Sequence, residues 1–560
     1  MRNIIIVEAF STGVNYITDI THRGYNPVVL EPAINEESLV RERKSTYERT
    51  KDKFEIIEEE NSYEKTLALV KTYNPALIVA GSEAGVELAT RLASDCGLPG
   101  NNINNIPKMT QKPAMHEALK EAGIRYIKGK VVDSSKDAIL FCKENNLTSA
   151  VVKPVQSAGS NGLYLCDNLE EVKNAVDELL TMTDLFGKTI TSVIIQERIV
   201  GTEYIVNTMS SAGKHRLSSF FRYRKVKTTE GGYIYDNTES IFNLEPGHTA
   251  LIEYAFKVAD AIGLEYGPIH GEYMIDENGP VLIEVNCRPM GLTLPAEFMD
   301  LIYGQHETDS ALDGYLAPEK FAAEASKPYR CLRQGYIKTI KVPKDLEAES
   351  LPIWIIAKNL RSTYLVDIAE PMSVHEFVKT RDLHTAGGLI YMVHDDKNIV
   401  DHDLKLLTYI EENYFSYIFN DGMSRKWFVD KSSRNNSIDT KELLSKAGST
   451  LIVADSDNTI KADGALIVTP DKISDVTAGF DQVILMFNEW IPTVNEVICL
   501  ERIFEIMKKV KIGGRVIIAE ETWKYLTYKR DGAELLLSIL GYRIEAPLPG
   551  QENMVIGSRK

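Results

Sequence analysis

The stretch HGEYMIDENGPVLIEVNCR, residues 270–288, decides the fold of this chain. Two apolar-rich runs flank a turn that contains Asn278-Gly279, and such a dipeptide between alternating strands predicts a β-hairpin. With its loop centred on Asn278, the hairpin places Glu272 opposite Glu284. Because side chains alternate along a strand, the even-numbered residues of both strands project from one face. That face carries His270, Glu272, Glu284, Asn286 and Arg288.

Opposed carboxylates about 5 Å apart destabilise a strand pair, so a sequence that places Glu272 opposite Glu284 usually holds a cation between them. Two carboxylates and the amide oxygen of Asn286 suit Mg²⁺ or Mn²⁺, with water and phosphate oxygens completing the coordination. Arg288, on the same face, could bind a phosphate or a carboxylate through two parallel hydrogen bonds. The alternative is a solvated sheet face on which the carboxylates never meet, and a slip of one residue in register would produce it.

Composition excludes several classes of protein. The 560 residues exceed what one core holds and predict about three to five domains. The net charge of −17 argues against a protein that wraps nucleic acid through its phosphates. No apolar run approaches the roughly 20 residues that span a bilayer, so we expect no membrane segment. The six cysteines are scattered without a Cys-x-x-Cys pair, which excludes a zinc ribbon and fits a reducing, cytoplasmic compartment.

The pattern of strands and helices predicts an α/β protein of several domains. Residues 1–108 alternate β-branched runs with helical stretches, which predicts a small parallel sheet. The turn after the first strand, residues 9–13, lacks the glycine spacing that binds a dinucleotide, so we do not expect a cofactor there. A polar stretch before the last domain predicts a linker. The predicted boundaries are 1–108, 109–192, 193–310, 311–420, 421–449 for the linker, and 450–560 for a separate α/β domain.

Three further segments could bind an anionic ligand. Lys153 ends an apolar strand and precedes the small-residue loop QSAGSNG, residues 156–162, whose backbone N–H groups could cover phosphate oxygens. The alternative is a flexible hairpin with an edge lysine. Residues 193–204 could offer backbone groups to an adenine edge and Glu203 to ribose hydroxyls, or could form a core strand and a surface turn. In the stretch FFRYRKVK, residues 220–227, the cationic part 222–227 could bind an anion or form a solvated strand face.

Taken in order, these pieces resemble the ATP-grasp superfamily of carboxylate–amine ligases, over roughly residues 1–420. The resemblance implies an ATP-grasp fold between a Rossmann-like N-terminal domain and a trailing α+β lobe, with ATP and Mg²⁺ (or Mn²⁺) as cofactors. The implied nucleotide site has Lys112 and Lys153 on the phosphates, Ser157, Gly159, Ser160, Asn161 and Gly162 over them, and Glu197, Ile199, Val200 and Glu203 around adenine and ribose. The implied metal ligands are Glu272, Glu284 and Asn286, and the predicted catalytic cations are Arg288, Arg222, Arg224 and Lys225.

Within the superfamily the chain looks most like amino-acid ligases that form dipeptides or related amides, through the segment KTRDLHTAGG at residues 379–388. The predicted reaction begins when a substrate carboxylate attacks the γ-phosphate of ATP, which gives an acyl phosphate and ADP. An amine then displaces phosphate, so both substrates are small molecules. Such chemistry needs positioning and charge neutralisation more than a nucleophilic side chain. One alternative is a carboxylase that phosphorylates bicarbonate, although no biotin-bearing Met-Lys-Met segment is evident. The other is a catalytically silent regulator that binds a nucleotide.

The last domain resembles the later half of a class I methyltransferase, through KIGGRVII at residues 511–518. After the predicted strand 451–454, however, the chain reads Asp-Ser-Asp-Asn in place of the glycine-rich turn that admits S-adenosylmethionine. We therefore expect a degenerate, Rossmann-like domain of methyltransferase type that docks a partner or regulates the ligase. An active methyltransferase is the alternative, and a homo-oligomer or a protein partner held through this domain stays open.

Overall fold

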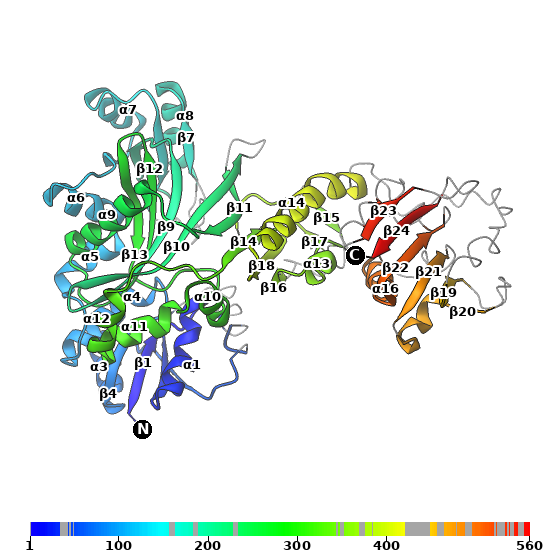
Figure 1. Ribbon diagram of the computed structural model, residues 1–560. Helices are drawn as coiled ribbons and strands as arrows, with labels where there is room; N and C mark the ends of the chain where they lie inside the picture. Colours follow the sequence, from blue (N-terminus) through cyan, green and yellow to red (C-terminus); the bar gives the residue numbers. More distant parts are fainter. Residues whose placement is uncertain are drawn as a thin grey trace. The chain divides into compact units, whose positions relative to one another are not determined.

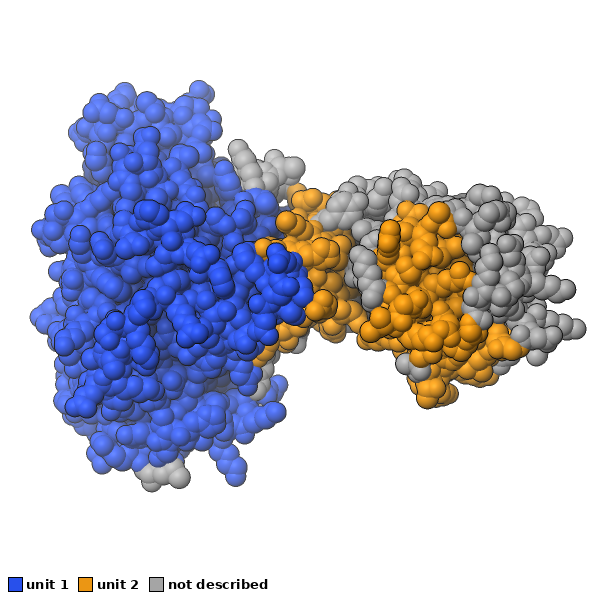
Figure 2. Space-filling model, viewed as in Figure 1, with its two compact units in different colours: residues 1–339, 380–386, 391–400 blue, residues 340–379, 387–390, 401–560 orange. Residues whose placement is uncertain are grey.

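The computed structural model describes most of the chain as two compact units (Figure 2). The first comprises residues 1–339, 380–386 and 391–400, and the second comprises residues 340–379, 387–390 and 401–560. The described residues are 2–33, 43, 46–48, 50–155, 163–182, 189–227, 233–342, 345–347, 352–368, 376–383, 385–419, 448–455, 464–477, 479–487, 496–519, 522, 533–534, 537, 542–546 and 554–559. None of the helices among them is long and apolar enough to cross a membrane. The predicted loop residues 157–162 and linker residues 421–447 lie outside this set, and the domain boundaries stay a prediction.

The first unit begins with a four-stranded parallel sheet of order β3-β2-β1-β4. Its central strand serves two cores, since Ile4 and Ile6 belong to one apolar cluster and Ile5 and Val7 to another. A parallel sheet covered on both faces needs such continuously apolar strands. The βαβ pattern predicted from the sequence is thus confirmed. The elements are β1 (Asn3–Val7), α1 (Asn15–His22), β2 (Asn26–Glu31), β3 (Glu55–Glu58), α3 (Tyr63–Thr72), β4 (Pro75–Ala80) and α4 (Gly85–Asp95).

A second, antiparallel sheet of order β5-β8-β6-β7 follows. Its inner face is apolar, and Val152 and Ile195 pack there against Val172 and Val176 of a covering helix. This layer carries Lys153 at the end of its strand β6. The elements from the first sheet onward are α5 (Ile106–Thr110), α6 (Lys112–Glu121), β5 (Gly129–Val132), α7 (Ser135–Glu144), β6 (Ala150–Pro154), β7 (Tyr164–Cys166), α8 (Leu169–Leu179) and β8 (Val193–Glu197).

The large sheet of the first unit runs in the order β13-β12-β9-β10-β11-β14, with antiparallel neighbours. Helix α9 lies across it (Figure 1), and its Leu251 and Val258 are buried in one core with Val206 and Leu282 of the strands. Part of the opposite face is also covered, because Met209 of the sheet is buried there with Ala311 and Leu312. The elements are β9 (Thr202–Ser211), β10 (Lys214–Lys227), β11 (Tyr233–Ser240), α9 (Pro246–Ile262), β12 (Gly267–Asp276), β13 (Gly279–Asn286), α10 (Ala296–Tyr303), α11 (Glu307–Leu316), α12 (Pro318–Ala325) and β14 (Gln334–Thr339).

The hairpin predicted from residues 270–288 is formed by β12 and β13, and Glu272 pairs with Glu284 as expected. The predicted loop centre was wrong, however. Asp276 pairs with Gly279, so the turn consists of two residues and is not centred on Asn278. The register then shifts between Glu272 and the next residue, where Ile283 is the extra residue of a β-bulge. The bulge restores the pairing that the turn alone would have displaced by one residue.

The second unit ends in a six-stranded sheet of order β20-β19-β21-β22-β24-β23. Strands β19 to β22 are parallel, and β24 runs antiparallel between β22 and β23. The four strands predicted for this region are present. Across residues 340–560 the elements are β15 (Leu346–Glu347), α13 (Pro352–Lys358), β16 (Thr363–Ile368), β17 (Glu376–Phe377), β18 (Gly388–His394), α14 (Lys397–Phe419), β19 (Thr450–Ala454), β20 (Ala465–Val468), β21 (Phe480–Met486), α16 (Glu496–Lys508), β22 (Val510–Ile518), β23 (Tyr542–Glu545) and β24 (Val555–Arg559).

Candidate active site

The acidic face of the β12–β13 hairpin lies beside the first residue of α6. The ammonium nitrogen of Lys112 is 2.8 Å from Oε2 of Glu284, although the two residues are far apart in sequence. Glu284 in turn faces Glu272 across the strand pair. The structure therefore brings together the predicted metal ligands and one of the two predicted phosphate lysines.

Lys153 lies close enough to the acidic hairpin face for the charges there to change the pKa of its ammonium group. Its side chain is buried, and burial lowers the pKa of the ammonium to about 8, against the attraction of Glu284 and Glu272 and with the repulsion of Lys112. On α6, burial also lowers the pKa of His116 to about 4, assisted by Lys153. A buried lysine with a second lysine near it is a place where an anion is stabilised. This environment fits the predicted contact with phosphate.

A third carboxylate reaches the same region from β9. Glu203 is 2.8 Å from the ammonium of Lys225 on β10, and Lys225 also lies 4.6 Å from the centre of the Tyr235 ring. Burial raises the pKa of Glu203, and the charges of Glu272 and Glu284 raise it further, while Lys225 opposes them. The predicted ribose residue is thus held by a cation at the edge of the acidic hairpin face.

The charge of Glu272 affects the protonation of Glu203, because the two carboxylates lie in one site. Burial alone would raise the pKa of Glu272, but His270, Lys225 and Lys112 outweigh burial and lower it. Glu272 therefore stays ionised, whereas the raised pKa of Glu203 favours its protonated form. A divalent cation would remove this conflict, because it stabilises both carboxylates in the ionised form.

The residues present fit a hard cation such as Mg²⁺. Glu272, Glu284 and Asn286 supply two carboxylates and an amide oxygen, the donor set that Mg²⁺ binds together with phosphate oxygens. Among the described residues, no group of three or more His, Cys, Asp and Glu side chains is placed to hold a metal ion by itself. Because Mg²⁺ takes about six oxygen ligands, a metal ion held by these three residues would share its coordination with water or a bound ligand.

Arg288 contacts a residue that sequence reasoning missed. Its Nε is 3.4 Å from Oε2 of Glu83, which follows β4 of the N-terminal sheet. Burial raises the pKa of Glu83, and Arg288 opposes that effect. The available signal was the position of Glu83 at the carboxyl end of a parallel strand, where α/β sheets commonly bind ligands.

Strained backbone follows Arg288. Leu292 and Thr293 have φ angles of 72° and 47°, in the left-handed region that non-glycine residues rarely adopt. Hydrogen bonds from the N-terminal domain hold them, because the hydroxyls of Ser11 and Thr12 accept from the backbone N–H groups of Thr293 and Leu294 at 3.1 and 2.8 Å. Such strain clusters at ligand-binding sites. No sequence pattern indicated this segment.

The predicted cationic group on β10 is divided by the structure. Arg222 and Arg224 both contact Glu239 on β11, at 3.1 and 3.3 Å from their Nε atoms, whereas Lys225 contacts Glu203. The reason is alternation along the strand, together with a register shift after Arg224. The structure does not bring Arg222 and Arg224 to the acidic hairpin face, so their role as catalytic cations stays a prediction.

The predicted adenine segment follows β8. Glu197 ends the strand, and its Oε2 lies 3.4 Å from the backbone nitrogen of Lys128. Ile199 is half-buried, and Val200 is 76% exposed, which leaves an apolar side chain available to a ligand. The loop residues Ser157, Gly159, Ser160, Asn161 and Gly162 lie outside the described residues.

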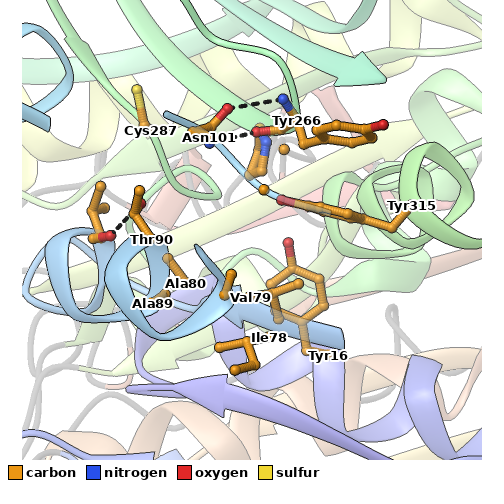
Figure 3. A pocket seen from close by; sticks show the side chains of 15 residues that line it. Tyr16, Ile78, Val79, Ala80, Ala89, Thr90, Asn101, Tyr266, Cys287 and Tyr315 are labelled. Carbon is orange, nitrogen blue, oxygen red and sulfur yellow. Dashed lines mark hydrogen bonds between the residues drawn. The ribbon is translucent and has the colours of Figure 1, made fainter. Parts of the chain in front are cut away.

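A cavity elsewhere in the first unit is not the nucleotide site. Figure 3 shows it between the N-terminal sheet and Tyr266, with the hydroxyls of Tyr16 and Tyr315 directed toward it. Asn101 closes one side through two hydrogen bonds of 2.9 Å with the backbone of Tyr266. The cavity of about 30 Å³ has no charged lining residue. It therefore offers no cation to bind the phosphates of a nucleotide.

Comparison with known proteins agrees with this geometry. A sequence model described as an ATP-grasp domain matches residues 147–295, which include Lys153, Glu203 and the whole hairpin. This chain contains an ATP-grasp domain. Dapdiamide A synthase from Enterobacter agglomerans is 25% identical over 327 residues, which span 58% of this chain and 76% of that protein.

Solved structures extend the likeness of fold. An L-amino acid ligase from Bacillus licheniformis aligns with a TM-score of 0.56 and 15% identity, over 73% of this chain and 97% of its own. An N5-carboxyaminoimidazole synthase from Aspergillus clavatus, in complex with ADP and its ribonucleotide, aligns with a TM-score of 0.53 and 12% identity over 73% and 98%. The ATP-grasp protein is thus an ATP-dependent carboxylate–amine ligase that forms ADP, as the sequence predicted.

Proposed function

We propose that this ligase activates the carboxylate of one amino acid with ATP and Mg²⁺ and joins it to the amine of a second. The observation that carries the proposal is the set of ion pairs around one hairpin face, where Glu284 lies beside Lys112 and Glu203 beside Lys225. Acids and bases alternate there at contact distance, as a site for a metal–triphosphate complex requires. The similarity to a dapdiamide synthase and an L-amino acid ligase supports amino acids as the substrate class.

In the proposed reaction, an oxygen of the substrate carboxylate forms a bond to the γ-phosphorus of ATP. The bond between that phosphorus and the β–γ bridging oxygen breaks, and ADP leaves with the electron pair. The amine nitrogen then attacks the acyl carbon, phosphate leaves with the electrons of the acyl–oxygen bond, and the nitrogen releases a proton. No side chain becomes covalently bonded in either step.

The chain's own residues position and neutralise the reactants. Lys112 would turn from Glu284 to phosphate oxygens, and Lys153 would supply a second ammonium to them. Arg288 would hold the acyl group beside the strained segment that follows it. Glu272, Glu284 and Asn286, on the hairpin strands, would hold the metal ion. When bound, Mg²⁺ neutralises charge on the transferred phosphoryl group.

A screen of amino-acid pairs for phosphate release, followed by mass spectrometry of the products, tests this proposal. We expect ADP and phosphate in equal amounts, with an amide whose mass is the sum of both amino acids less one water. AMP and pyrophosphate would contradict an acyl phosphate. Phosphate release that depends on bicarbonate alone would favour the carboxylase alternative, and nucleotide binding with no turnover would favour the silent regulator.

We further propose that the C-terminal domain is a methyltransferase-like module without a donor site. The support is its strand order, a parallel sheet with one antiparallel strand inserted before the last, which class I methyltransferases share. Asp455 follows β19 where such enzymes have glycine. A thermal-shift measurement with S-adenosylmethionine should show no change in melting temperature, and a rise would indicate an active donor site.

A further inference from the structure

Glu83 is a loosely paired acid beside the acidic hairpin face. Its side chain is 45% exposed, whereas those of Glu203, Glu272 and Glu284 are 14%, 17% and 22% exposed. Its contact with Nε of Arg288 measures 3.4 Å, which is longer than the roughly 2.7–2.9 Å of a charge-assisted hydrogen bond. An ion pair this open and exposed contributes little to stability, so a ligand can separate it at small cost.

Both members of this pair keep hydrogen-bonding groups for a ligand. Within the part of the chain that the structure describes, neither carboxyl oxygen of Glu83 accepts a hydrogen bond. The guanidinium of Arg288 donates one, from Nη1 to the carbonyl oxygen of Pro289 at 3.1 Å, and its Nη2 donates none to a described residue. A carboxylate can therefore bind the guanidinium through Nη2 and Nε while an ammonium binds Glu83.

Glu83 also lies within reach of the charges of the proposed ligase site. Although half-exposed, it is surrounded closely enough by protein that burial raises the pKa of its carboxyl. The charge of Glu284 raises that pKa as well, whereas Arg288 and Lys112 lower it. These are the residues proposed to hold the metal ion, the acyl group and the phosphates. Glu83 therefore stands inside the site and not on the outer surface.

The backbone that carries Arg288 is held without Glu83. The N–H of Met290, two residues later, donates to Oε2 of Glu307 at 2.6 Å. Oε1 of Glu307, a buried carboxylate, accepts from the amide nitrogen of Asn207 at 2.6 Å. These contacts anchor the segment from a helix on the other side of the chain's order, so positioning of Arg288 does not account for an acid at residue 83.

We propose that Glu83 recognises the ammonium group of the amino acid whose carboxylate the ligase activates, while Arg288 holds that carboxylate. Covalent geometry places the ammonium nitrogen of an amino acid about 3 Å from its carboxylate oxygens, which matches the 3.4 Å between Oε2 of Glu83 and Nε of Arg288. The zwitterion would replace one open ion pair by two. The inference rests on the proposed function and deepens it, because it makes a free α-amino group a requirement for the acyl donor.

Hydroxylamine as the acceptor isolates the acyl donor, because its nitrogen attacks the acyl phosphate, releases phosphate and a proton, and leaves a hydroxamate to be measured. The donors are L-alanine, L-leucine and L-phenylalanine, together with any donor that the amino-acid screen identifies. Each is compared with its des-amino acid, which is propanoate, 4-methylpentanoate or 3-phenylpropanoate for the first three. We expect kcat/KM of the wild-type protein to favour the amino acid about 10- to 100-fold, the range that one hydrogen bond between charged groups supplies.

Glu83→Gln removes the charge and keeps the shape. We expect kcat/KM for the amino acid to fall about 10- to 100-fold and kcat/KM for the des-amino acid to stay within about threefold, so that the preference is lost. Glu87→Gln is the matched control and should keep the preference. Glu87 is the next acid along the chain, is 61% exposed, and lies 3.7 Å from Nη1 of Arg91.

Three results would overturn the proposal. These are a wild-type protein without preference, a preference that survives in Glu83→Gln, and an equal fall for both acids in that variant, which would assign Glu83 to positioning Arg288. The first needs no variant, so it decides the case even if Glu83→Gln fails to fold. Should the wild type ligate no pair of amino acids, the proposed function fails. Calorimetric titration of the same acids, with Mg²⁺ and a non-hydrolysable ATP analogue, then tests Glu83, and amino acids that bind no better than their des-amino acids overturn its assignment.

Discussion

ATP binding should draw a proton onto Lys153 in alkaline solution. Burial lowers the pKa of the Lys153 ammonium to about 8 in the free protein. At pH 8, about half of the molecules therefore carry an uncharged lysine before the nucleotide binds. A triphosphate favours the charged form and raises this pKa toward its ordinary value. Binding should then take up about 0.5 proton at pH 8, and less than about 0.1 at pH 6.5.

Calorimetry in two buffers of different ionisation enthalpy measures this uptake, with Mg²⁺ and a non-hydrolysable ATP analogue. Lys153→Met should remove the uptake at pH 8, and Lys130→Met, which alters an exposed lysine of the same small sheet, should retain it. Proton release from Glu203 on metal binding is common to all three proteins, so the difference between them reports Lys153. Equal uptake by wild type and Lys153→Met would refute the assignment of this lysine to the phosphates.

Three more outcomes follow from particular contacts. Glu284→Gln should lower kcat at least about 100-fold with the melting temperature little changed, and near-normal turnover would remove the metal assignment. Gly201→Ala should lower the free energy of unfolding by about 1–3 kcal/mol in urea titrations, because a Cβ there would lie 2.2 Å from the carbonyl oxygen of Ile275; unaltered stability would contradict that clash. Burial opposes the charge of His306, but Asp19 and Asp300 together outweigh burial and raise the pKa of the ring to about 10. The protonated ring should therefore stabilise the fold below pH 6.5, and this effect of about 4–5 kcal/mol should be lost as the pH rises to 10. Stability that is flat over this range would refute the last prediction.

The parts of the site that could be predicted are those set by local pattern. Alternation along two strands joined by a short turn is enough to bring Glu272 opposite Glu284, and the structure confirms that pairing. The same alternation explains the division on β10, where Arg222 and Lys225 contact different acids. Their closeness in sequence suggested one group, but neighbouring residues of a strand face opposite sides.

The parts that could not be predicted depend on contacts between distant segments. Glu83 contacts Arg288 only because the N-terminal sheet packs beside the end of β13, and Glu307 joins Asn207 from a helix one hundred residues later in the chain. Periodicity describes which face of an element is buried, but it does not say which element will cover that face. The fold class was therefore accessible from sequence, whereas these supporting residues required coordinates.

The bulge at Ile283 separates the tip of the hairpin from its root. Beyond it, Asp276 is clamped by Arg125 through two hydrogen bonds of 2.7 and 2.6 Å, so the tip has its own anchor. Changes of length or sequence at the exposed turn, Glu277 and Asn278, can be absorbed there without re-aiming the carboxylates at the root. A label attached at this turn should accordingly leave the chemistry at the root undisturbed.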